Sequence, residues 1–159
     1  MNRNFLLKTS PKMGILVAYT IKMSKEREMK KKIWLSAAFV ISLLPMLMNQ
    51  YGGRRGVQEI SGIINLRNPI GILSVLLFAA GIWFPFPRKR VGKILGAVGT
   101  IGIVISDLYE FFTWHILTVT GKFNLEFSLR HAFPAFYIGL ASSLAMVIAY
   151  FVIQKKLEE

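Results

Sequence analysis

The sequence predicts an all-α integral membrane protein with four transmembrane helices, both termini in the cytoplasm, and short amphipathic segments in the outer loops. Three observations support this fold class. Of the 159 residues, 53% are apolar, and the mean hydropathy is +0.48. Four uncharged apolar runs approach the length of a membrane span. The 20 Lys and Arg residues outnumber the 8 Asp and Glu residues and gather on one side of these runs.

Each predicted span is long enough to cross a bilayer as a helix. A hydrocarbon core of about 30 Å requires about 20 helical residues, and a helix satisfies its own backbone polar groups. The predicted spans cover residues 33–50, 69–87, 93–118 and 132–154, which together form a transmembrane domain over 33–154. Pro45 is expected to kink the first span, which we expect to remain uncleaved. Residues 1–32 form a basic cytoplasmic segment, and residues 155–159 form a short cytoplasmic tail.

The orientation follows from the distribution of basic residues. Residues 1–32, the connection between the second and third spans, and the C-terminal tail hold 15 of the 20 Lys and Arg residues, whereas the other two loops hold five. Basic residues favour the cytoplasmic side, which places both termini there, most simply in the plasma membrane. The same basic flanks are expected to attract anionic lipid at the cytoplasmic face, and nucleic acid is not an expected partner.

Both outer loops carry periodic apolar residues. In the first loop, Val57, Ile60 and Ile64 recur at helical spacing, which predicts a short amphipathic helix on the outer leaflet. In the second loop, residues 122–130 alternate between polar and apolar types as a strand does. Glu126 and Arg130 also have the spacing of a helical ion pair, so strand and interfacial helix both remain open for this segment.

Small residues mark two of the predicted helix faces. Small side chains let helix backbones approach closely in a membrane, and we expect these faces of spans three and four to pack against each other within one chain. A homodimer seam, or a contact in a larger membrane complex, is the alternative. The residues concerned are Gly92, Gly96, Gly99 and Gly102 in the third span and Ala141, Ala145 and Ala149 in the fourth.

Two carboxylates inside the third span are the first candidates for a functional site. Asp107 and Glu110 are three residues apart and therefore share one face of a helix, in the outer third of the membrane. With His115, they form a candidate site for an ion or a proton. In the structural alternative, Arg67 or Arg130 from the outer loops forms an ion pair with them.

The residue inventory excludes several chemistries. No phosphate-binding loop, zinc-protease helix motif or nucleophile elbow is present, and with no cysteine and two histidines a metal site or cofactor is not expected. A membrane aspartyl peptidase needs two aspartates, and Asp107 is the only one here.

Two functions remain. The favoured one is a noncatalytic accessory, regulatory or immunity-type subunit that acts through helix packing and the outer loops. The alternative is a small oligomeric transporter that couples to protons or cations through Asp107 and Glu110.

Overall fold

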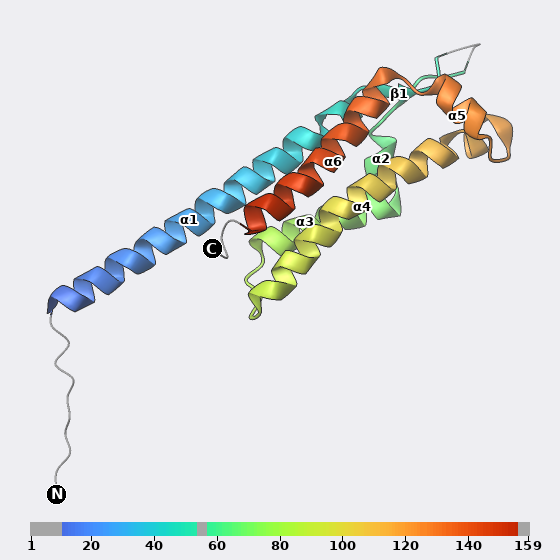
Figure 1. The fold of residues 1–159 in the computed structure, drawn as a ribbon. Helices are drawn as coiled ribbons and strands as arrows, with labels where there is room; N and C mark the ends of the chain where they lie inside the picture. The colour runs from blue at the N-terminus through green and yellow to red at the C-terminus, as the bar shows by residue number, and fades with distance from the viewer. Residues whose placement is uncertain (1–10, 54–56, 156–159) are drawn as a thin grey trace, which may run out of the picture. The chain divides into compact units, whose positions relative to one another are not determined.

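The computed structural model describes residues 11–53 and 57–155, which are mostly helical (Figure 1). The chain divides into two compact units, Met1–Trp34 and Leu35–Glu159. The described part of the first unit is helical and belongs to α1 (Pro11–Leu43). Its surface carries a Lys30–Glu26 ion pair of 2.8 Å, one helical turn apart. Residues 1–10 of the predicted N-terminal segment, 54–56 of the first predicted outer loop and 156–159 of the predicted C-terminal tail lie outside the described residues.

The second unit contains the rest of the fold. α1 ends at Leu43 and is followed by a 3₁₀ turn that contains Pro45, whose ring cannot continue the helix. In chain order the elements are η1 (Leu44–Leu47), β1 (Asn49–Tyr51), β2 (Ile60–Ser61), α2 (Ile64–Arg67), α3 (Pro69–Trp83), α4 (Lys89–His115), the π-helical turn η2 (Ile116–Thr120), α5 (Leu125–His131) and α6 (Pro134–Lys155).

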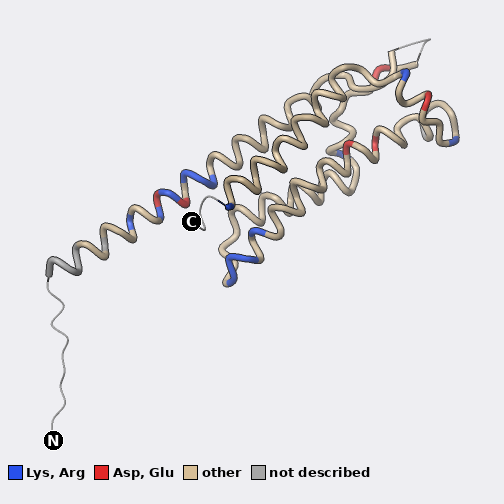
Figure 2. The backbone as a smooth tube through the Cα atoms, in the orientation of Figure 1, with Lys and Arg blue, Asp and Glu red and all other residues tan. Residues whose placement is uncertain are grey.

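Contacts between helix ends show that neighbouring helices of the second unit run in opposite directions. The Trp83 indole at the end of α3 donates to Ser36 Oγ in α1 at 3.1 Å. The Tyr150 hydroxyl near the end of α6 donates to the Lys93 carbonyl near the start of α4 at 2.8 Å. Residues of α1, α3, α4 and α6 therefore meet at one end of the unit, which we call the basic end because it carries Arg88, Lys89, Arg90 and Lys93 (Figure 2).

The opposite end, which we call the outer end, is built around β1. This strand pairs antiparallel with β2 and also forms a bridge between Tyr51 and Ala132, just after α5. Gly52 N–H donates to the His131 carbonyl at 2.9 Å, and Phe133 N–H donates to the Gln50 carbonyl at 2.8 Å. The turn that leaves β1 uses Gly52 and Gly53 at φ values of 97° and 75°, which favour glycine.

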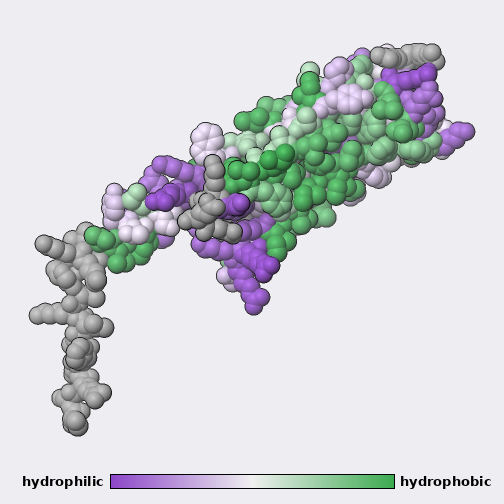
Figure 3. All heavy atoms as spheres, in the orientation of Figure 1, coloured by the Kyte–Doolittle hydropathy of each residue, from purple (hydrophilic) through white to green (hydrophobic). Residues whose placement is uncertain are grey.

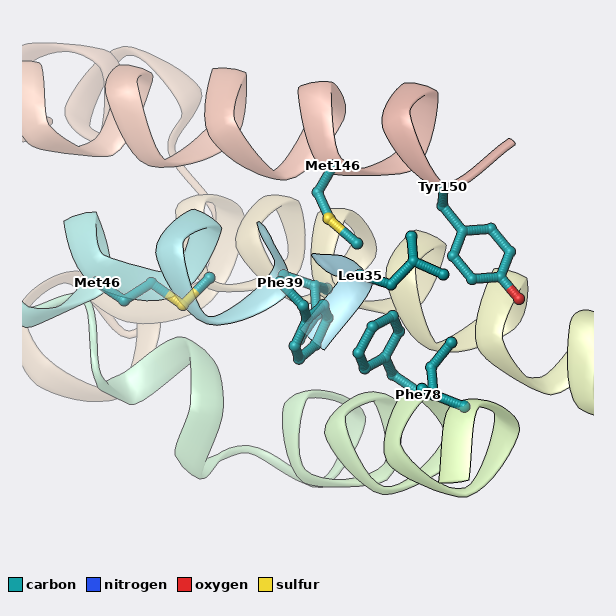
Figure 4. Close-up of a cluster of buried hydrophobic side chains, with 8 residues drawn as sticks. Leu35, Phe39, Met46, Phe78, Met146 and Tyr150 are labelled. Carbon is teal, nitrogen blue, oxygen red and sulfur yellow. The ribbon is translucent and has the colours of Figure 1, made fainter. Parts of the chain in front are cut away.

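An apolar core fills the second unit on the side of the basic end (Figure 4). The rings of Phe39 in α1 and Phe78 in α3 stack with their centroids 3.9 Å apart. Ile103 of α4 and Met146 of α6 complete the contact between the helices. A second apolar cluster lies toward the outer end and contains Tyr51, Phe111, Trp114 and Phe136.

The glycines of α4 pack mainly against α3, which corrects the predicted pairing of small residues. A Cβ atom on Gly92, Gly99 or Gly102 would collide with Gly81, Phe78 or Ser74 of α3, respectively, and only Gly96 faces α6, at Tyr150. In α6, Ala141 and Ala145 are exposed and Ala149 is half-buried. α4 and α6 do pack against each other within one chain, with Gly96 at Tyr150, but α6 buries Gly139, Ser143, Met146 and Tyr150 in place of the three alanines.

The surface of the helices is largely apolar. Figure 3 shows hydrophobic residues along the helices of the second unit and hydrophilic residues at the α3–α4 connection and at the outer end. Within the described chain, α4 and α6 are long and apolar enough to cross a membrane, and α3 is apolar but shorter. Only 39% and 28% of their apolar windows are buried in the protein, so most of these side chains face outward, unlike those of a soluble core helix.

Several predicted boundaries and one predicted element differ from the structure. Residues 49–51 form β1 rather than the end of a helix, and α3 ends at Trp83 rather than at residue 87. The predicted amphipathic helix of the first outer loop is wrong: Ile60 pairs with Tyr51 in the β1–β2 sheet, and only α2 is helical. In the second loop the helical alternative is confirmed, with Arg130 and Glu126 in an ion pair of 2.5 Å on α5.

Candidate functional site

The site begins with the loop that precedes α3. The side chain of Asn68 accepts a 2.7 Å hydrogen bond from Gly71 N–H and so caps α3, and Pro69 follows at the first helical position. A Cβ atom on Gly71 would collide with the Asn65 carbonyl, so the absence of a side chain lets α3 start close to α2. This tight corner directs the amides of Asn65 and Asn68 toward α4.

Asp107 lies at the centre of the site with only 1% of its surface exposed. Its Oδ1 accepts a 2.8 Å hydrogen bond from Asn65 Nδ2, and its Oδ2 accepts a 2.8 Å hydrogen bond from Ser143 Oγ in α6. Asn65 Nδ2 also donates to Gln50 Oε1 in β1 at 3.1 Å. Asp107 therefore joins three segments that are far apart in the sequence.

Glu110 occupies the next turn of α4 and is 6% exposed. Its Oε1 accepts a 2.9 Å hydrogen bond from Asn68 Nδ2, which also donates to Ser106 Oγ at 2.8 Å. Ser106 Oγ in turn donates to the Asn65 carbonyl at 2.5 Å. The two carboxylates thus share one hydrogen-bonded network with neutral amides and hydroxyls, which we call the polar network; its members are Gln50, Asn65, Asn68, Ser106, Asp107, Glu110 and Ser143.

Tyr51 borders the polar network and is fully buried. Its ring stacks on Trp114, one turn beyond Glu110, with centroids 5.4 Å apart. Burial raises the pKa of the Tyr51 hydroxyl above its usual value, and the charges of Asp107 and Glu110 raise it further. A side-chain hydrogen bond with Asn65 offsets part of this rise.

The other predicted site residues lie elsewhere. Arg130 pairs with Glu126 on α5, and Arg67 is exposed at the end of α2. Among the described residues, neither arginine forms an ion pair with Asp107 or Glu110. The structure instead brings the neutral donors of Asn65, Asn68 and Ser143 to the two carboxylates.

His115 belongs to a separate group of polar side chains. It is fully buried, and its Nε2 accepts a 3.0 Å hydrogen bond from Asn124 N–H. The neutral ring therefore carries its proton on Nδ1, which lies 3.0 Å from Ser128 Oγ. His115 ties the end of α4 to α5 and makes no hydrogen bond to Asp107 or Glu110. Among the described residues, no three His, Asp or Glu side chains are grouped so as to hold a metal ion.

Sequence reasoning located the carboxylates but missed their partners. Asn65 and Asn68 fall in the loop between the first two predicted spans, and Gln50 is the last residue of the first predicted span. One signal was present: Asn68 directly precedes the apolar run that begins at Pro69, where an asparagine commonly caps a helix. The long-range contacts of Ser143 and Gln50 could not be predicted from the local sequence, because a single serine or glutamine is compatible with both a buried and an exposed position.

Comparisons of the chain with protein-family models, with curated proteins and with solved structures find no match.

Proposed function

We propose that the protein spans the plasma membrane four times, through α1, α3, α4 and α6, with both termini in the cytoplasm. The lengths and composition of α4 and α6 support two of these spans, and the outward-facing apolar residues of α3 support a third. The contacts Trp83–Ser36 and Tyr150–Lys93 bring the four helices together at the basic end, which is the end that the distribution of Lys and Arg assigns to the cytoplasm.

We infer that within the membrane the protein acts as a noncatalytic accessory, regulatory or immunity-type subunit that binds a partner at its outer end. The observation that carries this proposal is a groove of about 630 Å³ between η1, β1 and the start of α6. Its walls are mainly apolar and include Leu47, Phe133 and Ile138, and Glu59 lies at its rim, hydrogen-bonded to Asn49 Nδ2 at 2.5 Å. Apolar walls with a polar rim are typical of a surface that receives another protein chain.

The apolar core argues against a transport function. Ile103 lies one helical turn from Asp107 on α4, and Met146 lies three residues beyond Ser143 on α6, both on the side of the basic end. Together with the stacked rings of Phe39 and Phe78, they fill the interior between the polar network and the basic end (Figure 4). A cation would have to cross this packed layer, in which the buried hydroxyls of Ser74 and Thr100 each donate to a carbonyl of their own helix.

Photo-crosslinking in cells tests the subunit proposal. A photoreactive amino acid at Ile138, in the groove, is compared with one at Ile148, which is equally apolar and exposed on α6 but lies outside the groove. We expect a discrete crosslinked product at position 138 and not at position 148. Coexpression of two differently tagged copies identifies a product made of two copies of this chain. Equal products at both positions, or none at 138, contradict a partner in the groove.

The transporter remains the second candidate because buried carboxylates in a membrane commonly mark ion pathways. Proteoliposomes containing the wild-type chain or the Asp107→Asn, Glu110→Gln double variant distinguish it. A proton or cation flux that the double variant abolishes would establish transport, whereas we expect no flux above that of empty liposomes from either protein.

A further inference from the structure

His115 takes part in a cycle of hydrogen bonds with Asn124 and Ser128. Asn124 N–H donates to His115 Nε2, and His115 Nδ1–H donates to Ser128 Oγ, each at 3.0 Å. The Ser128 hydroxyl in turn donates to the Asn124 carbonyl at 3.4 Å. A backbone N–H can only donate a hydrogen bond, so the cycle requires that Nε2 carries no proton.

Asn124 is also the residue that begins α5. Its Oδ1 accepts from Phe127 N–H at 3.0 Å and caps the helix, and its carbonyl accepts from Ser128 N–H at 3.1 Å. α5 has only seven residues, and a helix of this length is not stable without tertiary contacts. The hydrogen bond from Asn124 to His115 therefore holds the start of α5 against the end of α4.

We propose that residues 121–131 form a pH-sensitive element, which protonation of His115 releases from α4. A second proton can bind only to Nε2, because Nδ1 already carries one. Nε2 then becomes a donor that faces the donor Asn124 N–H, and the hydrogen bond between them is lost. The ring is also fully buried, where a charge without a partner is costly. The imidazolium is therefore stable only when residues 121–131 move away and water reaches the ring.

Among the described residues, the neighbours of His115 do not compensate a charge on its ring. The titratable and charged side chains of the surrounding elements are Tyr51 of β1, Glu110 of α4, Lys122 in the η2–α5 connection, and Glu126, Arg130 and His131 of α5. Glu110 is bonded to Asn68, and Glu126 pairs with Arg130 on the exposed face of α5. His131 stacks on Phe127, which also packs against His115, so a charge on His131 would oppose one on His115.

Release of α5 would also affect the groove. The His131 carbonyl accepts from Gly52 N–H, and Phe133, two positions later, lines the groove. A shift of α5 therefore moves part of the groove wall. This second effect rests on the proposed partner binding, whereas the release of residues 121–131 does not.

Nitrogen NMR of the imidazole rings tests the protonation state on which the release depends. The chain has two histidines, so the full-length protein in detergent gives signals from two rings, and His131→Asn assigns them. At about pH 7.5 we expect His115 to carry a proton on Nδ1 and none on Nε2. A proton on Nε2 at this pH overturns the proposal.

Hydrogen exchange tests the release itself. Protection of the amides of residues 124–131 is measured between about pH 7.5 and pH 5, corrected for the intrinsic exchange rate, with the amides of α3 as an internal reference. Each pH unit below about 6.5 should lower the protection about tenfold, because a released histidine has its ordinary pKa and each release takes up one proton. The α3 amides should keep their protection. If residues 124–131 keep theirs at pH 5, or if α3 loses protection equally, the proposal is wrong.

Variants assign the effect to His115. His115→Gln keeps an acceptor near the position of Nε2 and binds no proton, so it should remove the pH dependence. His131→Asn is the matched control, because it keeps a donor for the Phe127 carbonyl and leaves His115 in place, and it should retain the dependence. The reverse pattern, or an equal pH dependence in both variants, contradicts the proposal.

A titration of the His115 ring replaces the His115→Gln variant if that chain does not fold. In the His131→Asn chain, the ring nitrogens of His115 and the exchange protection of residues 124–131 are followed over the same pH range. Protonation and loss of protection should share one midpoint, because each requires the other. Protonation of His115 with full protection of residues 124–131 overturns the proposal.

Discussion

At the scale of single residues, Asn65 has the largest predicted effect on stability. Its amide donates to Asp107 and Gln50, and its carbonyl accepts from Ser106. Asn65→Ala leaves two buried acceptors without a donor, so we expect the free energy of unfolding to fall by about 2–4 kcal/mol. The matched control is Asn49→Ala, whose exposed amide bonds to Glu59 and should cost less than about 1 kcal/mol. Denaturation of both variants in mixed detergent micelles measures the difference; equal losses would mean that the polar network is not important for stability.

The raised pKa of the Tyr51 hydroxyl predicts that the protein loses stability at alkaline pH. Burial and the two nearby carboxylates raise the pKa of its hydroxyl in the folded protein above the ordinary value of 10.0. Above about pH 10, the unfolded chain loses this proton while the folded chain keeps it, so the free energy of unfolding falls as the pH rises. Tyr51→Phe should remove this contribution and leave a shallower alkaline decline.

Ultraviolet absorbance near 295 nm, which reports tyrosinate, tests the same residue directly. In the folded protein, Tyr51→Phe should leave the absorbance change between pH 9 and 11 unaltered, because Tyr51 does not ionise there. A smaller change in the variant would show that Tyr51 titrates as an ordinary tyrosine and would contradict its burial beside the carboxylates.

At the scale of elements, the contact between α3 and α4 depends on glycine. A Cβ atom on Gly99 would meet the backbone of Phe78, which cannot rotate away, so the helices must separate. Gly99→Ala gains about 1 kcal/mol of helix propensity, but we expect a net loss of about 1–3 kcal/mol because of the overpacking. Gly102→Ala meets the Ser74 hydroxyl instead and should cost less, and Gly102→Ala with Ser74→Ala should cost less again. Thermal unfolding midpoints rank these variants, and a Gly99→Ala variant as stable as wild type would contradict the close packing.

The exposed face of α6 provides the control for this contact. Ala145→Val adds two methyl groups at an exposed position, so it should leave the stability of the monomer within about 0.5 kcal/mol of the wild type. Size-exclusion chromatography of the same variant with light scattering tests the predicted homodimer seam. A change in mass would show that the alanine face binds a second copy.

The elements that the sequence predicted are those whose signal is local. The apolar runs of α3, α4 and α6 carry their own information, because each consists of consecutive residues that cannot face water on every side. The outer end is different. Ile60 forms a strand because it pairs with Tyr51, which is distant in the local sequence pattern. In residues 122–130, the alternation of residue types favoured a strand and only the Glu126–Arg130 spacing favoured the helix that forms. The site followed the same rule: Asp107 and Glu110 are conspicuous in an apolar run, whereas Asn65 and Ser143 acquire their roles only through the packing of α2 and α6 against α4.

At the scale of the whole molecule, the prediction that remains is the direction in which the chain crosses the membrane. The chain has no cysteine, so single cysteines introduced at exposed loop positions can be labelled without a background signal. Arg88 lies in the α3–α4 connection at the basic end, and Lys122 lies between η2 and α5 at the outer end; both are exposed. Because basic loops stay in the cytoplasm, a membrane-impermeant thiol reagent should label Lys122→Cys in intact cells and should label Arg88→Cys only after permeabilisation.

Labelling of Arg88→Cys in intact cells, with Lys122→Cys protected, would reverse the orientation and place the polar network in the cytoplasmic half of the bilayer. Labelling of both in intact cells would mean that α3 and α4 do not cross the membrane as a hairpin and would contradict the four-span proposal itself.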